Sequence, residues 1–245
     1  HIVTDIRLPR TLGAWTAGAL LGLAGALAQG LFRNPLADPY LLGSASGASL
    51  GVALMLAALG AGTDLPDSAW VQPVTVVSMF SGSLWVRLGL TGAAFGGAVI
   101  AVLLTLALAR GVGHTMRLLL AGVVVGVVLG ALTSLVMLFS PSSLQAMQAF
   151  LLGSTSFVGW NALALMANVW LLASAVAWPM ARVLDGLSLG EATARSLGLN
   201  LSRDRTWLLL SMTLATSLAV AHTGLIAFVG LAAPHMVRSL VQIRP

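Results

Sequence analysis

The chain has no cysteine and no lysine, and charged side chains of any kind are scarce. Only 8% of its 245 residues are charged, whereas soluble domains carry about a quarter. Without cysteine the chain has neither a disulfide nor a thiolate metal site. Without lysine it lacks the phosphate-binding pattern G-x-x-x-x-G-K-[ST], so we assign the small-residue run 43–51 to close helix packing rather than to ATP binding.

Apolar residues are abundant instead, at 58% of the chain. A helix that crosses a bilayer needs about 20 of them in succession. Runs of this length do not alternate between apolar and polar side chains, which argues against a barrel and for helices. Long stretches without a charged residue include 11–32, 39–63, 88–109 and 118–181. The sequence therefore predicts an all-α fold, a polytopic transmembrane helical bundle.

The predicted spans follow these stretches, and the last stretch is long enough for two. Residues 68–86 are uncharged but contain Gln72, Pro73 and several serines, and we interpret them as an interfacial loop. The expected spans are 11–32, 43–62, 88–109, 118–139, 160–181 and 206–222, with a shorter apolar piece at 225–241.

All 12 basic residues are arginines, and they lie near span ends, which indicates topology rather than a surface for nucleic acid. If the N-terminus is outside, nine arginines fall inside; if 68–86 also crosses and the N-terminus is inside, ten do. Charge alone does not choose between these models. Both of them place 182–205 in the cytoplasm.

Glycines recur four residues apart within the predicted spans. Such spacing lets helix backbones approach closely, either within one chain or at a dimer face or pathway wall. We favour packing within the chain. These glycines are Gly18, Gly22, Gly92, Gly96, Gly122, Gly126 and Gly130.

The segment 185–205 is the longest charged cluster, and it contains signals for a short helix. Ser188 followed by Glu191 has the spacing of a capping box, and Gly198 is positioned to end the helix. We expect three turns or fewer, too short to cross a bilayer. Asn200 or Ser202 is expected to cap the span that follows.

This short helix has a weak apolar face formed by Leu189, Ala192 and Leu197, and it also carries Arg195. A solvated linker is the simpler interpretation of such a charged segment. However, a linker needs no capped and terminated helix with leucines on one side. We therefore favour a docking surface for a soluble partner.

Three stretches together resemble one family. They are 7–51, which contains "NPLADP", 190–199 with "GEATARSLGL", and 224–241, which contains "FVGLAAPH". They are similar to the FecCD-type permeases, the membrane subunits of ABC importers for iron–siderophore complexes, haem and cobalamin. The resemblance implies a ten-helix subunit that works as a homodimer or pseudo-dimer. Its partners would be two cytoplasmic ATPase subunits, a soluble substrate-binding protein and the lipid bilayer, without nucleic acid.

The resemblance also sets the expected organisation of residues 1–245, a single transmembrane domain with a coupling-helix insert at 185–205. The family's first helix would precede Ile6 and its last two would follow Arg244, so we expect the chain to be a fragment. It implies that the segment around Arg7 is external. It makes 68–86 an external loop and predicts a short, non-crossing external helix within 141–158.

Two X-Pro steps predict a rigid turn after the first span. Proline removes a donor and disfavours helix at the residue before it, so the helix should stop near Arg33. A rigid turn at a span end is a sufficient explanation of this sequence. The resemblance adds a role, because matching positions narrow the cytoplasmic mouth of the transport pathway. The predicted gate residues are Asn34, Pro35 and Leu36, with His114 and Thr115 as the other half.

The predicted contacts with partner proteins likewise rest on the residue pattern and on the family resemblance. Docking of the ATPase is assigned to the short helix and its flanks, at Ser188, Glu191, Arg195, Leu197 and Gly198. Arg7 and Arg10 lie three residues apart on one helical face, which would also suit an anchor at the membrane interface. In the family the matching pair meets acidic residues of the binding protein, and such electrostatic docking suits a transient partner.

We predict no cofactor and no metal site. His222 and His235 have no carboxylate or cysteine near them in sequence, and a zinc or iron site wants three or four ligands. Chelated iron would also arrive wrapped in its own ligand.

The predicted function is that of a transport subunit rather than an enzyme, located in the bacterial inner membrane. We expect ferric siderophore as the substrate, with haem or cobalamin as the alternative. A secondary transporter would need intramembrane Asp, Glu or Lys, which the spans lack. An intramembrane protease would need a Ser–His pair or the zinc-binding sequence H-E-x-x-H; no such motif appears.

Overall fold

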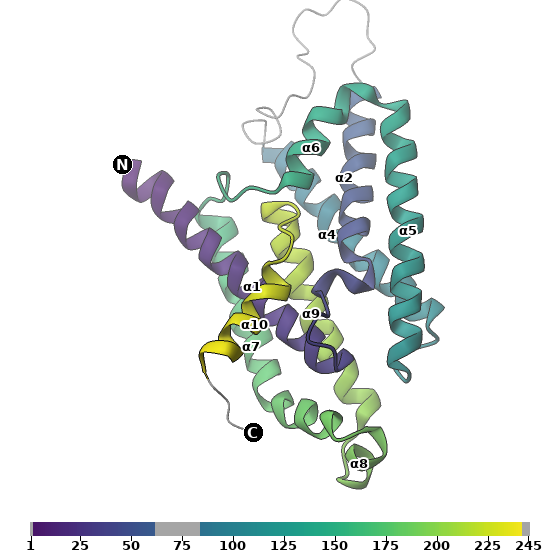
Figure 1. The fold of residues 1–245 in the computed structure, drawn as a ribbon. Helices are drawn as coiled ribbons and strands as arrows, with labels where there is room; N and C mark the ends of the chain where they lie inside the picture. The colour runs from purple at the N-terminus through teal and green to yellow at the C-terminus, as the bar shows by residue number, and fades with distance from the viewer. Residues whose placement is uncertain (1, 62–83, 242–245) are drawn as a thin grey trace, which may run out of the picture.

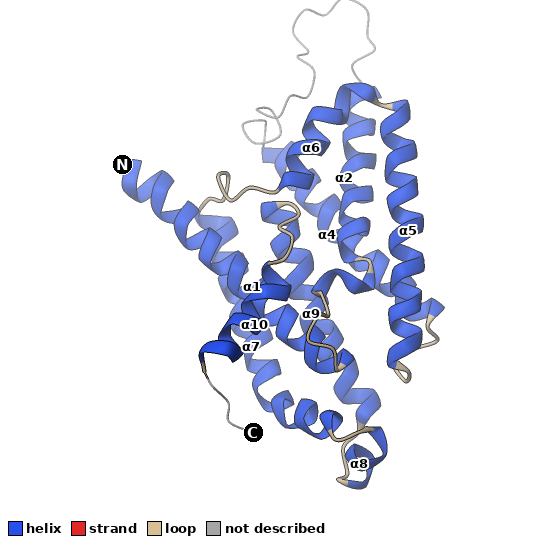
Figure 2. Ribbon diagram, in the orientation of Figure 1, coloured by secondary structure: helices blue, strands red, loops and turns tan. Residues whose placement is uncertain are grey.

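A computed structural model describes residues 2–61 and 84–241, and every regular element in that part of the chain is a helix (Figure 2). The all-α prediction is therefore confirmed. The long helices are α1 (Leu8–Phe32), α2 (Ser44–Ala61), α4 (Leu84–Leu108), α5 (Thr115–Phe139), α7 (Trp160–Ser188) and α9 (Leu201–Thr223). The short ones are η1 (Ile2–Arg7), η2 (Pro39–Leu42), η3 (Pro141–Ser143), α6 (Leu144–Leu152), α8 (Glu191–Ser196) and α10 (Val229–Leu240).

Five of the six predicted spans match helices that could cross a membrane, and several of these helices are longer than predicted. Five are long and apolar enough to cross a membrane: Ile2–Phe32, Leu88–Leu108, Thr115–Phe139, Trp160–Ser188 and Leu201–Thr223. Ser44–Leu59 is a shorter apolar helix. The predicted non-crossing helix within 141–158 is α6, which has nine residues. Of the predicted loop 68–86, only 84–86 lie in the described residues, and they open α4; the rest falls outside them.

Helix α9 lies at the centre of the bundle, beside α1 and α7. Its buried residues include Leu208 and Met212 and also several hydroxyls, among them Thr216 and Ser217. Thr216 Oγ1 donates to the carbonyl of Met212 at 2.9 Å, within its own helix. A helix with this many polar groups is stable in a membrane only when protein rather than lipid surrounds it.

Two glycines set the crossing of α2 and α4. A Cβ at Gly47 would overlap the carbonyl of Gly97, and a Cβ at Gly97 would overlap the carbonyl of Gly47. The two backbones are therefore in direct contact, as in other close helix crossings. The packing role predicted for the run 43–51 is confirmed, and its partner in α4 is Gly97.

The packing predicted for the regularly spaced glycines holds only in part. A Cβ on Gly122 would overlap the carbonyl of Leu41, so this glycine is needed for packing within the chain. At four of the others, a Cβ would meet no atom of the described residues within 4 Å. The prediction was wrong for these four, which are Gly18, Gly92, Gly96 and Gly130.

The long helices run alternately up and down, so their connections gather at two ends (Figure 1). One end carries α8, the turn between α1 and η2, and the 109–114 connection between α4 and α5. We call it the α8 end. The opposite end carries η1 and α6. Large apolar side chains are exposed along the outer helices, including Val127 of α5, Leu172 of α7 and Leu103 of α4, as expected for a surface that faces lipid or another subunit.

Candidate functional site

The turn after α1 stops the helix where the sequence predicted. Arg33 takes a left-handed conformation with φ 50°, and its N–H donates to the carbonyl of Gly30 at 3.3 Å. The N–H of Asn34 donates to the carbonyl of Gln29 at 3.1 Å, which satisfies the last turn of α1. Asn34 Oδ1 then accepts the N–H of Leu36 at 2.9 Å. Two successive turn bonds and Pro35 make this segment stiff.

The far side of the same turn is attached to the bundle. Asp38 Oδ1 accepts the N–H of Tyr40 at 2.8 Å and so caps η2. Thr105 Oγ1, buried in α4, donates to the carbonyl of Leu42 at 2.9 Å. Leu36, by contrast, is 70% exposed and points away from the core. A stiff backbone that presents an exposed side chain such as Leu36 suits the predicted gate. The gate role itself stays a prediction.

The second predicted half of the gate lies in the 109–114 connection and at the start of α5. Arg110 and Gly111 both have positive φ, at 56° and 94°, which turns the chain sharply between the two helices. His114 is exposed at the N-cap position of α5, and Thr115 is the first residue of that helix.

Helix α8 is real but shorter than the capping box implied. It contains six residues, and α7 continues as far as Ser188, whose hydroxyl donates back to the carbonyl of Asp185 at 2.6 Å. Gly190 breaks the chain between the two helices with φ 107° and ψ 153°, a conformation that suits glycine. The predicted capping box of Ser188 and Glu191 is therefore wrong, because Ser188 belongs to the preceding helix.

Other predictions about this helix are confirmed. Gly198 has φ 80° and follows the end of α8, with its N–H donating to the carbonyl of Arg195 at 3.0 Å. Asn200 caps α9, since its Oδ1 accepts the N–H of Arg203 at 3.2 Å. Both positions use the residue type that the local geometry favours.

The face that α8 turns toward the bundle is Ala194. This side chain is fully buried in a small cluster with Val183, Leu187 and Leu201 from the ends of α7 and α9. The leucines that the sequence assigned to the apolar face point outward instead: Leu189 is 66% and Leu197 62% exposed. An anchored helix with exposed leucines is a suitable shape for a docking surface.

One buried guanidinium joins α8, α9 and the 109–114 connection. Arg205, in the first turns of α9, is 2% exposed. Its Nη2 donates to Glu191 Oε1 at 2.5 Å, and its Nη1 donates to the carbonyl of Gly113 at 2.8 Å. A longer contact of 3.5 Å links Nη2 to Thr115 Oγ1. Thus a predicted docking residue and a predicted gate residue are bound by the same side chain.

Charge at this site favours the ionised form of Glu191. The hydrogen bond from Arg205 is the largest cause that holds the pKa of this carboxyl below its ordinary value of 4.5; the guanidinium groups of Arg33 and Arg195 act in the same direction, and burial opposes them. Since Arg33 follows α1 directly, the predicted gate turn also lies within electrostatic reach of α8.

We expect Glu191 to stay ionised, and its bond to Arg205 to persist, at any pH above 4.5. The pKa is lowered in the folded state, so this contribution to stability is present above the ordinary value and disappears as pH falls through the lowered one. Glu191 is the only glutamate in the chain, so selective ¹³C-glutamate labelling gives one carboxyl resonance to titrate by NMR.

In the Arg205→Gln variant the titration midpoint should move upward. A wild-type midpoint at or above 4.5 would contradict the assignment of this contact.

A second polar link holds α1 to α10. Arg238 Nη2 donates to Oε1 of the buried Gln29, and Gln29 Nε2 donates to the carbonyl of Leu231 at 3.1 Å. Gln29 lies one turn before the end of α1, so this link also steadies the start of the predicted gate turn.

The remaining predicted residues lie elsewhere. Arg7 and Arg10 are exposed at the end of the bundle opposite α8. His222 lies in α9, whereas His235 is exposed in α10. Within the described ranges no three His, Asp or Glu side chains are close enough to hold a metal ion.

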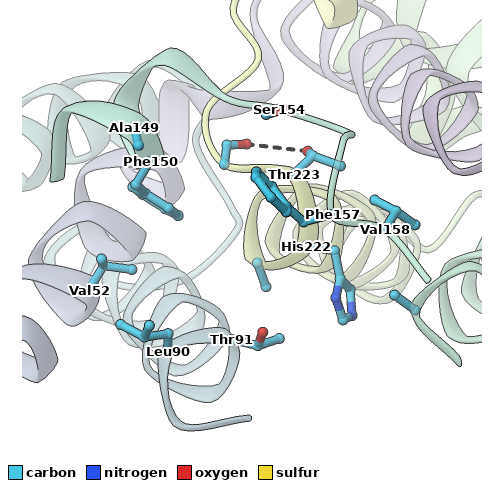
Figure 3. Close-up of a pocket in the computed structure, with 13 residues that line it drawn as sticks. Val52, Leu90, Thr91, Ala149, Phe150, Ser154, Phe157, Val158, His222 and Thr223 are labelled. Atoms are coloured by element: carbon cyan, nitrogen blue, oxygen red, sulfur yellow. Dashed lines mark hydrogen bonds between the residues drawn. The ribbon is translucent and has the colours of Figure 1, made fainter. Parts of the chain in front are cut away.

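A small cavity lies near the opposite end, between α4, α6 and the C-terminal end of α9 (Figure 3). Leu90, Phe150 and His222 are among the side chains that line it, and its volume is about 80 Å³. Sites for small molecules occupy about 300–1,000 Å³. This cavity is therefore too small for a metal chelate.

A larger hollow opens on the surface beside the predicted gate turn. It has a volume of about 580 Å³ and extends from Asp38 and Tyr40 along Gly122 and Val127 of α5 to Phe228. Phe228 has φ 66° and is 72% exposed. We call this hollow the α5 groove.

Arg205, Gln29 and Arg238 are site residues that the sequence did not predict. Arg205 was counted only as one of several basic residues on the cytoplasmic side. A signal was present, since the sole glutamate precedes it by 14 residues in the same insert. Gln29 and Arg238 are 209 residues apart, and no local pattern joins them.

The bundle and its apolar surface define a multi-pass α-helical membrane protein. Residues 1–245 match the FecCD transport family, and the chain belongs to this family. It is 40% identical to the ferric enterobactin transport system permease protein FepD of Escherichia coli over 242 residues, covering 98% of this chain and 66% of the relative.

Other members are similar in the same way. The cobalamin import system permease protein BtuC of Halobacterium salinarum is 36% identical, covering 98% of this chain and 59% of the relative. The hemin transport system permease protein HmuU of Yersinia pestis is 33% identical, with 97% and 66% covered. A solved inward-facing metal-chelate type ABC transporter matches with a TM-score of 0.79 and 28% identity, covering 98% of this chain and 70% of that one. The chain thus spans less than two thirds of the length of these curated relatives.

Proposed function

We propose that this chain forms the main part of a permease subunit of a binding-protein-dependent ABC importer in the bacterial inner membrane. It carries a ferric siderophore across the bilayer, and a separate pair of ATPase subunits supplies the energy. The observation that carries the proposal is α8, an anchored helix flanked by the exposed Leu189 and Leu197, at the end of the bundle that also bears the predicted gate.

In this proposal the ATPase docks on α8 and its flanks, and the gate opens and closes as two permease subunits rock against each other. The α5 groove supports a pathway shared between two copies, because it is open on one side and its lining begins at Asp38, two residues after Leu36 of the predicted gate. Arg7 and Arg10 would receive the binding protein at the opposite end, in a contact weakened by salt.

The choice of substrate rests on the relatives. Their names describe ferric enterobactin, cobalamin and hemin transport, and all three ligands are metal chelates. The match to the ferric enterobactin permease has the highest identity of the three, which supports a ferric siderophore. Cobalamin and haem are the alternatives within the same class.

Reconstitution tests this function. The permease, its ATPase and its binding protein are placed in liposomes, and uptake of radiolabelled ferric siderophore, haem and cobalamin is measured with and without ATP. We expect ferric siderophore to accumulate at least about tenfold above the ATP-free level, with little uptake of the other two. Uptake that needs an ion gradient and no ATP would overturn the proposal in favour of a secondary transporter.

A further inference from the structure

Glu191 was predicted to contact the ATPase, yet its carboxylate points into the protein and binds Arg205. We infer that Glu191 and Arg205 are positioning residues that fasten α8 to the 109–114 connection, so that movement of α8 is passed to His114 and Thr115. This inference rests on the proposed function and adds an internal mechanical link to it.

The contacts of Arg205 make this link stiff. Its guanidinium donates to a side chain on α8 and to the main chain of the 109–114 connection while its own backbone belongs to α9. The carbonyls of Gly113 and Val112 belong to the main chain, so these bonds fix the backbone of the connection and not a mobile side chain. Any shift of α8 that keeps the bond to Glu191 must therefore pull on this connection.

Burial makes the pair hard to separate. Arg205 is 2% exposed, and carbonyl groups alone do not neutralise its charge. Removing one partner of a buried ion pair leaves an uncompensated charge and is strongly destabilising. The other acid nearby, Asp204, contacts Arg203 at 3.6 Å, so Glu191 is the carboxylate that balances Arg205.

One N–H group of the Arg205 guanidinium, at Nε, is available for a further hydrogen bond. Among the described residues, Arg205 Nε is buried and has no hydrogen-bond partner. A second carboxylate contact through Nε would keep the pair joined if α8 tilts, as a link between moving parts requires.

The first experiment uses the permease without its partners. Because the chain has no cysteine, spin labels at Ala192→Cys on α8 and Met116→Cys on α5 attach only at those sites, both of which are exposed. We expect electron spin resonance to give one narrow distance distribution in the otherwise unchanged protein. In Arg205→Gln, and in Glu191→Gln where it folds, the distribution should broaden or shift.

Arg203→Gln is the matched control. It removes an arginine two residues away whose side chain is 71% exposed, so the label distances should not change. The Glu191 side chain is 31% exposed, so Arg205→Gln leaves its carboxylate partly in water and provides a folded variant even where Glu191→Gln, which leaves the buried Arg205 charge unpaired, fails to fold.

The second experiment uses the assembled transporter and separates coupling from docking. We expect Arg205→Gln, a change inside α9 and away from the docking face, to retain the ATPase subunits and their hydrolysis within about twofold but to lower uptake per ATP hydrolysed about tenfold. The double variant Glu191→Gln/Arg205→Gln should lose no more than the worse single variant, because both changes break one link.

Unchanged label distances together with unchanged uptake per ATP in Arg205→Gln would overturn the inference, as would losses that add in the double variant. If Glu191→Gln loses ATPase binding and Arg205→Gln keeps it, Glu191 is a docking residue, and the inference is again overturned. If the unchanged permease binds no ATPase, the proposed function fails, while the label distances still decide whether the link exists.

Discussion

Replacing Gly97 by valine is expected to reduce the yield of folded permease at least about tenfold. The main chains of α2 and α4 touch at Gly47 and Gly97, and a side chain at position 97 would occupy the space of the Gly47 carbonyl. Overpacking of a core usually costs about 1–3 kcal/mol. The cost here should reach or exceed the upper value, because the obstacle is backbone that no change of rotamer can relieve.

The neighbouring residue provides the control. A Cβ at Gly96 would meet no atom within 4 Å, so Gly96→Val adds the same side chain to the same helix without a clash. The measurement is the amount of monodisperse protein after detergent extraction, followed by its thermal unfolding midpoint. Similar yields from the two variants would show that α2 and α4 do not cross as closely as described.

The second large effect is expected at the outer face of α8. Leu189→Asp with Leu197→Asp should weaken binding of the ATPase at least about tenfold and abolish ATP-dependent uptake. Fully burying a leucine side chain is worth about 1.5–3 kcal/mol, and an aspartate in its place would be buried without a partner. Both leucines are mostly exposed in this chain, so the fold should be unaffected.

Ser202→Asp adds a negative charge at another exposed position near the same end and removes no leucine. Co-purification of the ATPase with each permease variant measures the effect. If the leucine variants retain the ATPase as well as Ser202→Asp does, docking does not take place on this face.

The helical class and the approximate spans could be predicted because lipid imposes a simple rule. A long apolar run that crosses lipid and does not alternate with polar residues forms a helix, and the structure has helices at these runs. The stop after α1 could also be predicted, since Pro35 and Pro39 restrict the backbone wherever they occur. Local chemistry likewise sufficed for Asn200 and Gly198, whose roles depend on a few adjacent residues.

Predictions that depended on how helices meet were less successful. Gly92 and Gly96 have the favoured spacing, but the rotation of α4 brings Gly97 to α2 instead. A regular spacing identifies a face and does not identify the face that is buried. The capping box failed for a related reason: Ser188 and Glu191 have the right separation, yet the positive φ at Gly190 assigns them to different helices.

In the candidate site, too, local features could be predicted and contacts between distant segments could not. Sequence and resemblance selected three segments at the α8 end, but Arg205, which joins two of them, α8 and the 109–114 connection, looked like an ordinary basic residue at a span end. Its role depends on burial and on carbonyls 92 residues away, and neither follows from a linear pattern.

A cross-link from α8 in living cells tests the central claim most directly. A photoreactive amino acid at Leu197 should yield one major product on illumination, the permease joined to its cytoplasmic ATPase, and the product should be absent when the same amino acid replaces Arg7. A cross-link from Leu197 to an extracytoplasmic protein, or none to the ATPase in a strain that transports normally, would contradict an importer driven through α8.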